Sequence, residues 1–300
     1  MKTIKIILLV AACLMTNTAF SQNYISYYPT QWDFRNQVDL IDFSQVKSLT
    51  IKELTVEESE EHPLLETHVI WNNNFQLTDY QFVNYNNSYA DFDIRFNYAD
   101  AHSKKLKSVQ IINPNTLKTV EDWQYTYGGF DVEKIKVKRY LLNVPEPDVF
   151  EVKYEGNDDD YTQETVYNPQ NSVVKRTAFW YKANKDGTTL QLSKLYVDDI
   201  LDQTDSLLLD KNGKKLANYV INLGISDETK YNYKTRKVDL AGDEFDYQEL
   251  ERIQRNGKDI ERYEYQYDAK GNWTERKTYQ MKSGKWQYTK LTRRVMEYRN

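Results

Sequence analysis

Two of the three histidines are spaced in a way that raises the question of metal binding. His62 and His68 are six residues apart, and three glutamates lie within two residues of one or the other. Imidazole and carboxylate groups bind zinc, but this spacing is not typical of a zinc motif, and strand residues would converge only across a hairpin. We therefore expect polar surface residues here and predict no metal site.

A run of acidic residues raises the same question for calcium. The segment "GNDDDYTQE", residues 156 to 164, contains three consecutive aspartates. Calcium loops interleave their ligands with a defined turn, whereas three consecutive side chains of an extended segment point alternately to opposite sides. A solvated loop is the preferred interpretation.

Pairs of carboxylates are the residues that a glycosidase would use. Asp91 with Asp93, and Asp243 with Asp246, are close enough in sequence to serve as an acid and a nucleophile or base. In a chain with 45 acidic residues such pairs arise by chance. The motifs Gly-x-Ser-x-Gly and His-Glu-x-x-His and a phosphate-binding glycine loop do not occur. We expect a protein that is not an enzyme, with no catalytic residues and no cofactor.

Composition favours an all-β protein. The 300 residues include 25 Tyr, 11 Phe and 6 Trp but only 10 Gly and 6 Pro. Tyrosine suits a half-exposed sheet because its ring packs while its hydroxyl reaches water. The formal charge is −5 and both signs are interspersed, so nucleic acid is not expected as a partner.

The first 21 residues are typical of a signal peptide. Lys2 and Lys5 precede an apolar run from Ile6 to Met15, which is too short to span a bilayer, and small residues precede Gln22. We expect export to the periplasm, the outer-membrane surface or the medium, with no transmembrane span. Cleavage before Gln22 would remove the only cysteine, and with it any disulfide or thiolate chemistry. The alternative is a lipobox at "VAAC", in which Cys13 would carry a lipid anchor.

The elements that must position any site are expected to be β-hairpins. In "YQYDAKGNWTERKTY", residues 265 to 279, tyrosines alternate before an Asp-x-x-Gly turn and a β-prone return strand. The turn pattern recurs in "YNPQNSVVKRT" from Tyr167, where asparagines replace Asp268 and Gly271. Turn glycines at 187, 213, 257, 271 and 284 continue it, and degenerate copies lie upstream at 70–77, 97–109 and 124–137. This pattern predicts a succession of antiparallel hairpins.

Helical signals are weak along the chain. The best helix candidates are Val46 to Glu61, where Val, Ile and Thr favour a strand instead, and Asp198 to Leu209. The prolines of "VPEP", residues 144 to 147, mark either a boundary between two hairpin arrays or a bend. We expect a degenerate hairpin region at 22–143 and clearer hairpin repeats at 148–300, or one continuous sheet made of both.

The segment "YDAKGN" and its tyrosine-rich flanks resemble the YD repeats of RHS-type secreted proteins, and with the signal sequence they resemble exported hairpin-repeat proteins of Bacteroidetes-type bacteria. The motif matches closely only at residues 267 to 272 and loosely over 167 to 300. The resemblance implies an all-β fold in which successive antiparallel hairpins form an extended, curled repeat sheet with little helix. It also implies export and a repeat that is not catalytic.

Strand alternation predicts that aromatic side chains from neighbouring hairpins share a face. The candidate ligand-binding residues are Trp180, Tyr181, Tyr265, Tyr267, Trp273, Tyr279, Trp286 and Tyr288. Such a face could stack on sugars, but cross-strand aromatic pairs also simply stabilise a sheet. The preferred function is a non-enzymatic cell-envelope scaffold or protein-interaction module. The alternatives are a glycan-binding module that uses the aromatic face and, more remotely, an envelope hydrolase.

Overall fold

A computed structural model describes residues 40–57, 60–87, 91–129, 131–141, 144–157, 161–222, 224–240 and 243–299. The signal peptide and Cys13 lie outside these ranges. Within them the chain forms strands and one short 3-10 turn at Phe43–Gln45, and no α-helix occurs there. The strands are β1 (Val46–Glu57), β2 (Glu60–Trp71), β3 (Leu77–Asn84), β4 (Phe92–Tyr98), β5 (Leu106–Asn113), β6 (Lys118–Gly128), β7 (Asp131–Arg139), β8 (Asp148–Asn157), β9 (Tyr161–Tyr167), β10 (Val173–Ala183), β11 (Thr189–Val197), β12 (Ile200–Leu209), β13 (Lys215–Asn222), β14 (Ile225–Leu240), β15 (Asp243–Arg255), β16 (Lys258–Tyr267), β17 (Trp273–Lys282) and β18 (Lys285–Tyr298).

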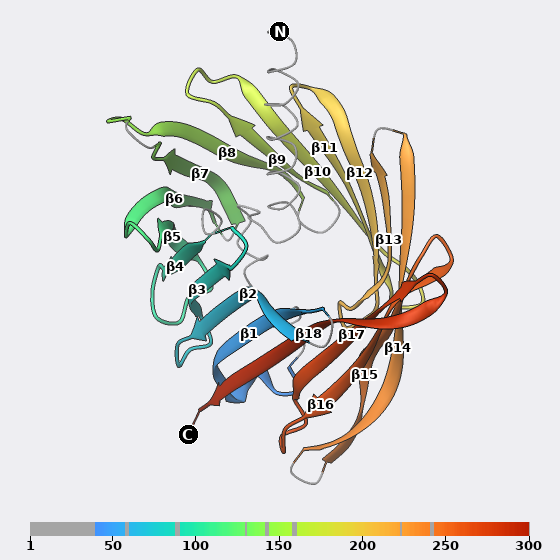
Figure 1. The fold of residues 1–300 in the computed structure, drawn as a ribbon. Coiled ribbons are helices and arrows are strands. Elements are labelled where there is room, and N and C mark those ends of the chain that lie inside the picture. The colour runs from blue at the N-terminus through green and yellow to red at the C-terminus, as the bar shows by residue number, and fades with distance from the viewer. Residues whose placement is uncertain are drawn as a thin grey trace, which may run out of the picture.

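The sheet is an 18-stranded antiparallel barrel (Figure 1). Each strand pairs with its neighbours in sequence, and β1 also pairs with β18, where Leu49 lies opposite Met296 and Leu54 opposite Leu291. The all-β prediction is confirmed, but the prediction of an extended, curled sheet of YD-repeat type is wrong. Closure gives the first and last strands hydrogen-bond partners that an open sheet would leave exposed at its edges.

The connections lie at two mouths of the barrel because consecutive strands are antiparallel. Turns that follow odd-numbered strands lie at one mouth, here called mouth A. Turns that follow even-numbered strands lie at the other, mouth B, together with residues 40–45 and the end of β18. The two mouths differ in chemistry.

The predicted turn recurs with one geometry. The first residue's N–H donates to the fifth residue's carbonyl, and the fourth residue's N–H donates to the first residue's carbonyl, at Asn72–Gln76, Asn168–Ser172, Asn184–Thr188, Asp210–Lys214 and Asp268–Asn272. The fourth residue has a positive φ, +78° at Gly271 and +62° at Asn171, which is why glycine or asparagine is favoured there. The hairpin prediction for these segments is confirmed.

Both segments with helical signals are strands in this fold. Residues 46–57 form β1, in agreement with the strand interpretation, and residues 200–209 form β12. Leucines of β12 lie opposite leucines of β11, since Leu208 pairs with Leu190, so tertiary pairing outweighs local helix propensity. On either side of "VPEP", β7 and β8 pair with each other in the same sheet.

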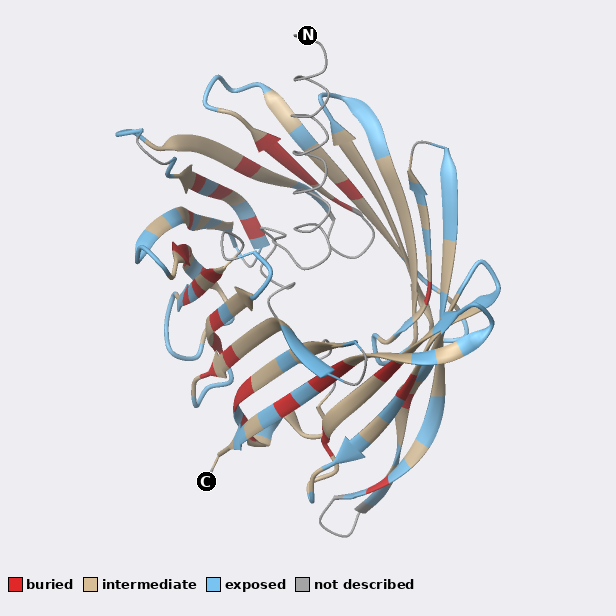
Figure 2. Cartoon of the chain, viewed as in Figure 1, coloured by how far each residue is buried: buried red, intermediate tan, exposed pale blue. Residues whose placement is uncertain are grey.

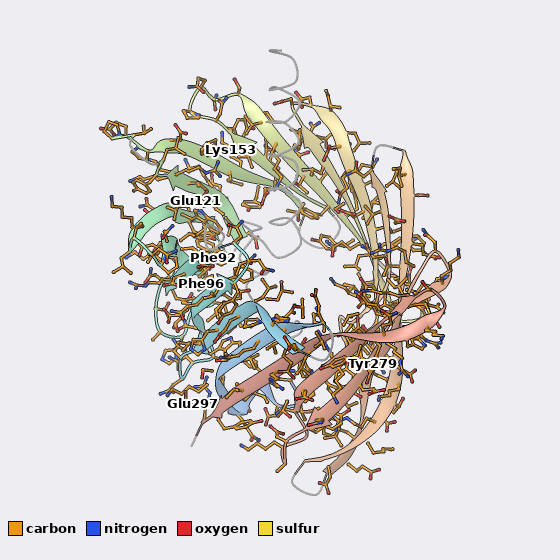
Figure 3. All side chains as sticks on the ribbon, in the orientation of Figure 1. Phe92, Phe96, Glu121, Lys153, Tyr279 and Glu297 are labelled. Carbon is orange, nitrogen blue, oxygen red and sulfur yellow. The ribbon has the colours of Figure 1, made fainter. Side chains whose placement is uncertain are left out.

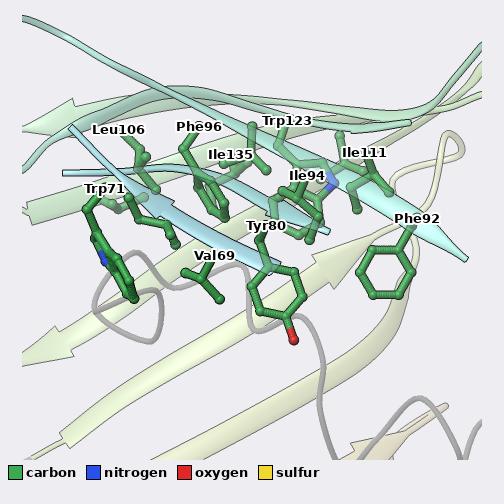
Figure 4. Close-up of a cluster of buried hydrophobic side chains, with 14 of the residues drawn as sticks. Val69, Trp71, Tyr80, Phe92, Ile94, Phe96, Leu106, Ile111, Trp123 and Ile135 are labelled. Atoms are coloured by element: carbon green, nitrogen blue, oxygen red, sulfur yellow. The ribbon is translucent and has the colours of Figure 1, made fainter. Parts of the chain in front are cut away.

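Strands β1 to β9 carry one hydrophobic core, and buried positions recur along these strands (Figure 2). In β4, buried Phe92, Ile94 and Phe96 alternate with polar residues, and Ile94 lies opposite Ile111 of β5. The cluster continues to the fully buried Trp123, and its side chains project from these strands into the enclosed space (Figure 4). Burying this apolar face drives the strong curl of the sheet.

The outer face of the same strands is charged. Lys134 of β7 pairs with Glu151 of β8 at 3.2 Å, and Arg293 of β18 pairs with Glu61 of β2 at 2.7 Å. This polarity is the reverse of a barrel whose outer face contacts lipid, in which apolar residues point outward. Strands β10 to β13 are less charged outside, where Leu192 lies opposite Trp180.

Candidate functional site

The predicted aromatic residues fall into separate groups. Tyr265, Tyr267 and Trp273 lie together on β16 and β17, with ring centroids 6.4 Å apart for the tyrosines and 6.0 Å apart for Tyr265 and Trp273. Cations lie over their faces, with the Arg236 guanidinium 4.0 Å from the Tyr267 ring and that of Arg294 4.0 Å from Trp273. This group is therefore a cation–aromatic cluster.

A second group lies on the opposite face of the same hairpins. Tyr279 and Tyr288 are 5.6 Å apart with ring planes tilted by 41°. The Arg262 guanidinium is 4.5 Å from the Tyr279 ring and 5.6 Å from Trp286, and Lys277 lies over Tyr288. Figure 3 labels Tyr279 among the side chains of this region. These rings do not form the coplanar row that would be expected of a sugar-stacking surface.

Trp180 and Tyr181 lie on β10, away from both groups. Because they are consecutive in a strand, they point to opposite faces of the sheet. The Lys194 amine lies 5.8 Å from the Trp180 ring. The structure therefore does not bring all the predicted aromatic residues onto one surface, and ligand contact by any of them stays a prediction.

A buried carboxylate beside the first aromatic group was not anticipated from the sequence. Glu249 of β15 is fully buried, and both of its oxygens accept hydrogen bonds from the Tyr267 hydroxyl at 2.6 Å. Lys234 and Arg236 of β14 lie 3.2 and 3.5 Å from the carboxylate. Nothing in "YQELE" distinguishes this glutamate from its neighbours, because its burial depends on pairing with Lys234 of β14 and on the Tyr267 side chain of β16.

Burial and hydrogen bonds to carboxylates strongly raise the pKa of three tyrosines, Tyr263, Tyr279 and Tyr298, and the main cause differs between the first two. The hydrogen bond to Glu264, together with burial, raises the pKa of Tyr279 to about 12. Burial is the main cause that raises the pKa of Tyr263 far above its usual value, and the neighbouring Glu261 adds to it. Both shifts keep the hydroxyl protonated, so neither tyrosine is prepared to act as a base.

The acidic and histidine candidates are dispersed. Asp91 accepts a hydrogen bond from the Asn84 backbone N–H, burial raises the pKa of Asp93, and Asp246 pairs with Lys237 at 2.8 Å. His68 contacts the Thr50 hydroxyl at 2.8 Å. The Asp243 side chain and residues 158–160 lie outside the described residues. Among the groups that are described, no three His, Cys, Asp or Glu side chains are placed to hold a metal ion.

Exposed apolar side chains gather at mouth A. The most exposed are Leu117 between β5 and β6 at 79%, Ile200 after β11 at 72% and Ile225 after β13 at 70%. We call the full set the apolar rim: Tyr85, Leu117, Tyr140, Leu141, Val144, Val197, Ile200, Leu201, Ile221 and Ile225. Clustering of exposed apolar residues marks an interaction surface, whereas isolated ones do not.

Mouth B has fewer exposed apolar side chains. Turns in which an Asn or Asp oxygen accepts backbone N–H groups occur at both mouths, at Asp210 in mouth B and at Asn168 in mouth A, so the difference lies in the apolar residues. Near this mouth the exposed large apolar residues of the described ranges are Phe75 and Tyr267, each close to the lower limit of exposure, and Val295, which is 65% exposed on β18 three residues before the strand ends. The contrast identifies mouth A, and not the barrel ends in general, as the candidate site.

No helix in the described part of the chain has the length and apolar character needed to cross a membrane. No protein-family model and no curated protein matches the chain.

Three solved structures show weak similarity. A porin-like protein from Bacteroides uniformis is 13% identical and aligns over 84% of this chain and 98% of its own, with a TM-score of 0.38. A TcdB2–TccC3–Cdc42 complex and the Tc holotoxin pore of Photorhabdus luminescens are each 12% identical, with TM-scores of 0.26 and 0.25. The chain spans 15% and 13% of the length of those two toxin chains. Likeness at this level assigns neither family nor function, and the YD-repeat resemblance stays unconfirmed.

Proposed function

We propose that the protein is an exported, non-enzymatic barrel that serves as a scaffold at the cell envelope and attaches there through its apolar rim. The observation that carries this proposal is the asymmetry of the two mouths. Leu117, Ile200 and Ile225 are largely exposed at mouth A, whereas of the described residues near mouth B only Val295 is exposed to a similar degree. Apolar side chains held in water on rigid turns are stabilised when another surface covers them.

The titratable groups support a role without catalysis. Glu249 is held by two cations and a tyrosine, and Asp259 is held by Arg252 at 3.0 Å and by Gln254 at 2.8 Å. A nucleophile, a base and an orienting group do not converge among these residues. Glycan binding has less support, because the Arg262 guanidinium already lies over one face of the Tyr279 ring and near the Trp286 ring.

Photo-crosslinking in exporting cells tests the proposal. A benzophenone amino acid is placed at Leu117 or Ile200 in mouth A, and at Lys185 or Asn212 in the turns of mouth B as matched controls. We expect adducts with an envelope protein or lipid from the mouth A positions and few from mouth B. Equal labelling from both mouths, or adducts confined to the cytoplasm, would contradict the proposal.

A further inference from the structure

We propose that the apolar rim binds the surface of a lipid bilayer, an inference that rests on the proposed function and specifies the attachment partner. The first observation is the form of the rim. Its most exposed members stand on separate tight turns: Leu117 closes the turn after β5, where its N–H donates to the Asn113 carbonyl, and Ile200 follows the turn at Asp198–Asp199. Separate projecting side chains do not form a groove that a peptide or helix could occupy.

The second observation is the extent of the rim around the barrel. Leu117 and Ile225 are separated by the strands from β6 to β13, and neighbouring strands lie about 4.8 Å apart. The exposed apolar tips therefore follow an arc of roughly 40 Å. A bilayer is laterally continuous and fluid, so it can receive tips that are spread over such an arc without shape complementarity.

The third observation limits the depth of insertion. Asp198 and Asp199 directly precede Ile200, and the Asp199 side chain is 74% exposed although Arg176 lies 3.6 Å away. Below Tyr140 and Leu141, the outer face of β7 and β8 carries ion pairs such as Lys134 with Glu151. Desolvating these charges in hydrocarbon would cost more than burying the tips gains, so the barrel would rest on the interface instead of spanning it.

The charges next to the tips also indicate the headgroup. Asp198, Asp199 and Asp202 lie next to Ile200 and Leu201, but Arg176 lies 3.6 Å from Asp199, and the exposed Lys118 follows Leu117. Mixed charges at the contact give no net attraction to anionic headgroups. Binding should therefore be at least as strong to neutral phosphatidylcholine vesicles as to vesicles that contain phosphatidylglycerol.

Vesicle flotation tests the inference. The full exported chain is used with Cys13→Ser, so that no lipid anchor contributes, and is mixed with phosphatidylcholine vesicles. The test variant carries Ile200→Asp and Ile225→Asp, and the matched control carries Val295→Asp, an apolar residue on β18 that is 65% exposed but lies outside the rim. We expect the double variant to lower the partition coefficient roughly tenfold or more, and the control to leave it unchanged. Melting curves of both variants check that the barrel is folded, and the pair Ile200→Leu with Ile225→Leu should retain binding.

The inference is overturned if the Cys13→Ser chain does not float, if Val295→Asp reduces flotation as much as the rim variant does, or if only anionic vesicles bind. The proposed function is tested separately, by the cross-linking experiment. If mouth A cross-links to an envelope protein while vesicles do not bind, the scaffold proposal stands and the bilayer inference falls. If neither mouth cross-links in cells, both fall.

Discussion

Replacing Glu249 with glutamine is expected to destabilise the barrel strongly, because this carboxylate is the buried partner of three groups. Its oxygens lie 2.6 Å from the Tyr267 hydroxyl, 3.2 Å from Lys234 and 3.5 Å from Arg236. Removing one member of a buried ion pair typically costs about 3–5 kcal/mol. Here the Lys234 side chain is 42% exposed and can regain water, and glutamine still accepts from the tyrosine. The expected loss is therefore about 2–3 kcal/mol.

For a domain of this size, such a loss lowers the melting midpoint by about 4–6 °C. The assay is thermal unfolding followed by circular dichroism, with Glu244→Gln as the matched control, because Glu244 pairs with Lys237 on a surface where both side chains are 64% exposed. The control should melt close to the parent chain. If Glu249→Gln also melts with the parent chain, or if both variants fall equally, the argument from burial is refuted.

Three further predictions concern a turn, a tyrosine and the core. Gly271 and Gly257 both have positive φ, but a Cβ at Gly271 would lie 3.1 Å from the Val238 side chain, whereas a Cβ at Gly257 would have open space around it. In chemical denaturation, Gly271→Ala should therefore lower the free energy of unfolding by about 1 kcal/mol more than Gly257→Ala does. The pKa of Tyr279 in the folded protein is about 12, against a usual 10.0, so its contribution to stability is complete below pH 10 and is lost as the pH rises toward 12. Tyr279→Phe should flatten the curve of stability against pH between these values, and an unchanged curve would contradict the assignment. Trp123 is fully buried in the core, so Trp123→Ala should cost about 3–5 kcal/mol in the same denaturation assay, and a loss below about 1 kcal/mol would show that this side chain does not anchor the core.

The turns could be predicted from sequence because their determinants are local. An Asp or Asn at the first position bonds backbone N–H groups two and four residues later, and a Gly or Asn at the fourth position accepts positive φ. Both requirements fall within five residues. The degenerate copy at Asn72 could be recognised for the same reason, although Phe75 occupies the position that glycine would favour.

The alternation of aromatic and polar residues likewise indicated the strands, but it did not indicate which side chains of neighbouring strands would share a face of the sheet. Tyr265 and Tyr279 belong to neighbouring strands and were predicted to share an aromatic face, yet β17 places Tyr279 opposite Arg262, whereas Arg276 lies opposite Tyr265. Register decides this, since a shift of one residue moves a side chain to the other face. Register in turn depends on the bulges near each turn, which the residue pattern does not reveal.

The sequence by itself therefore determined the all-β class, the hairpins and the turn chemistry, because each depends on residues close together in the chain. Only the tertiary structure decided that β1 and β18 pair, that Glu249 is enclosed, and that Leu117 and Ile225 belong to one rim. Pairing energy depends on groups that meet after the whole chain has curled around its core. Antiparallel pairing assigns alternate turns to opposite ends of the sheet, and the curl of the sheet brings the apolar residues of one end around a single mouth.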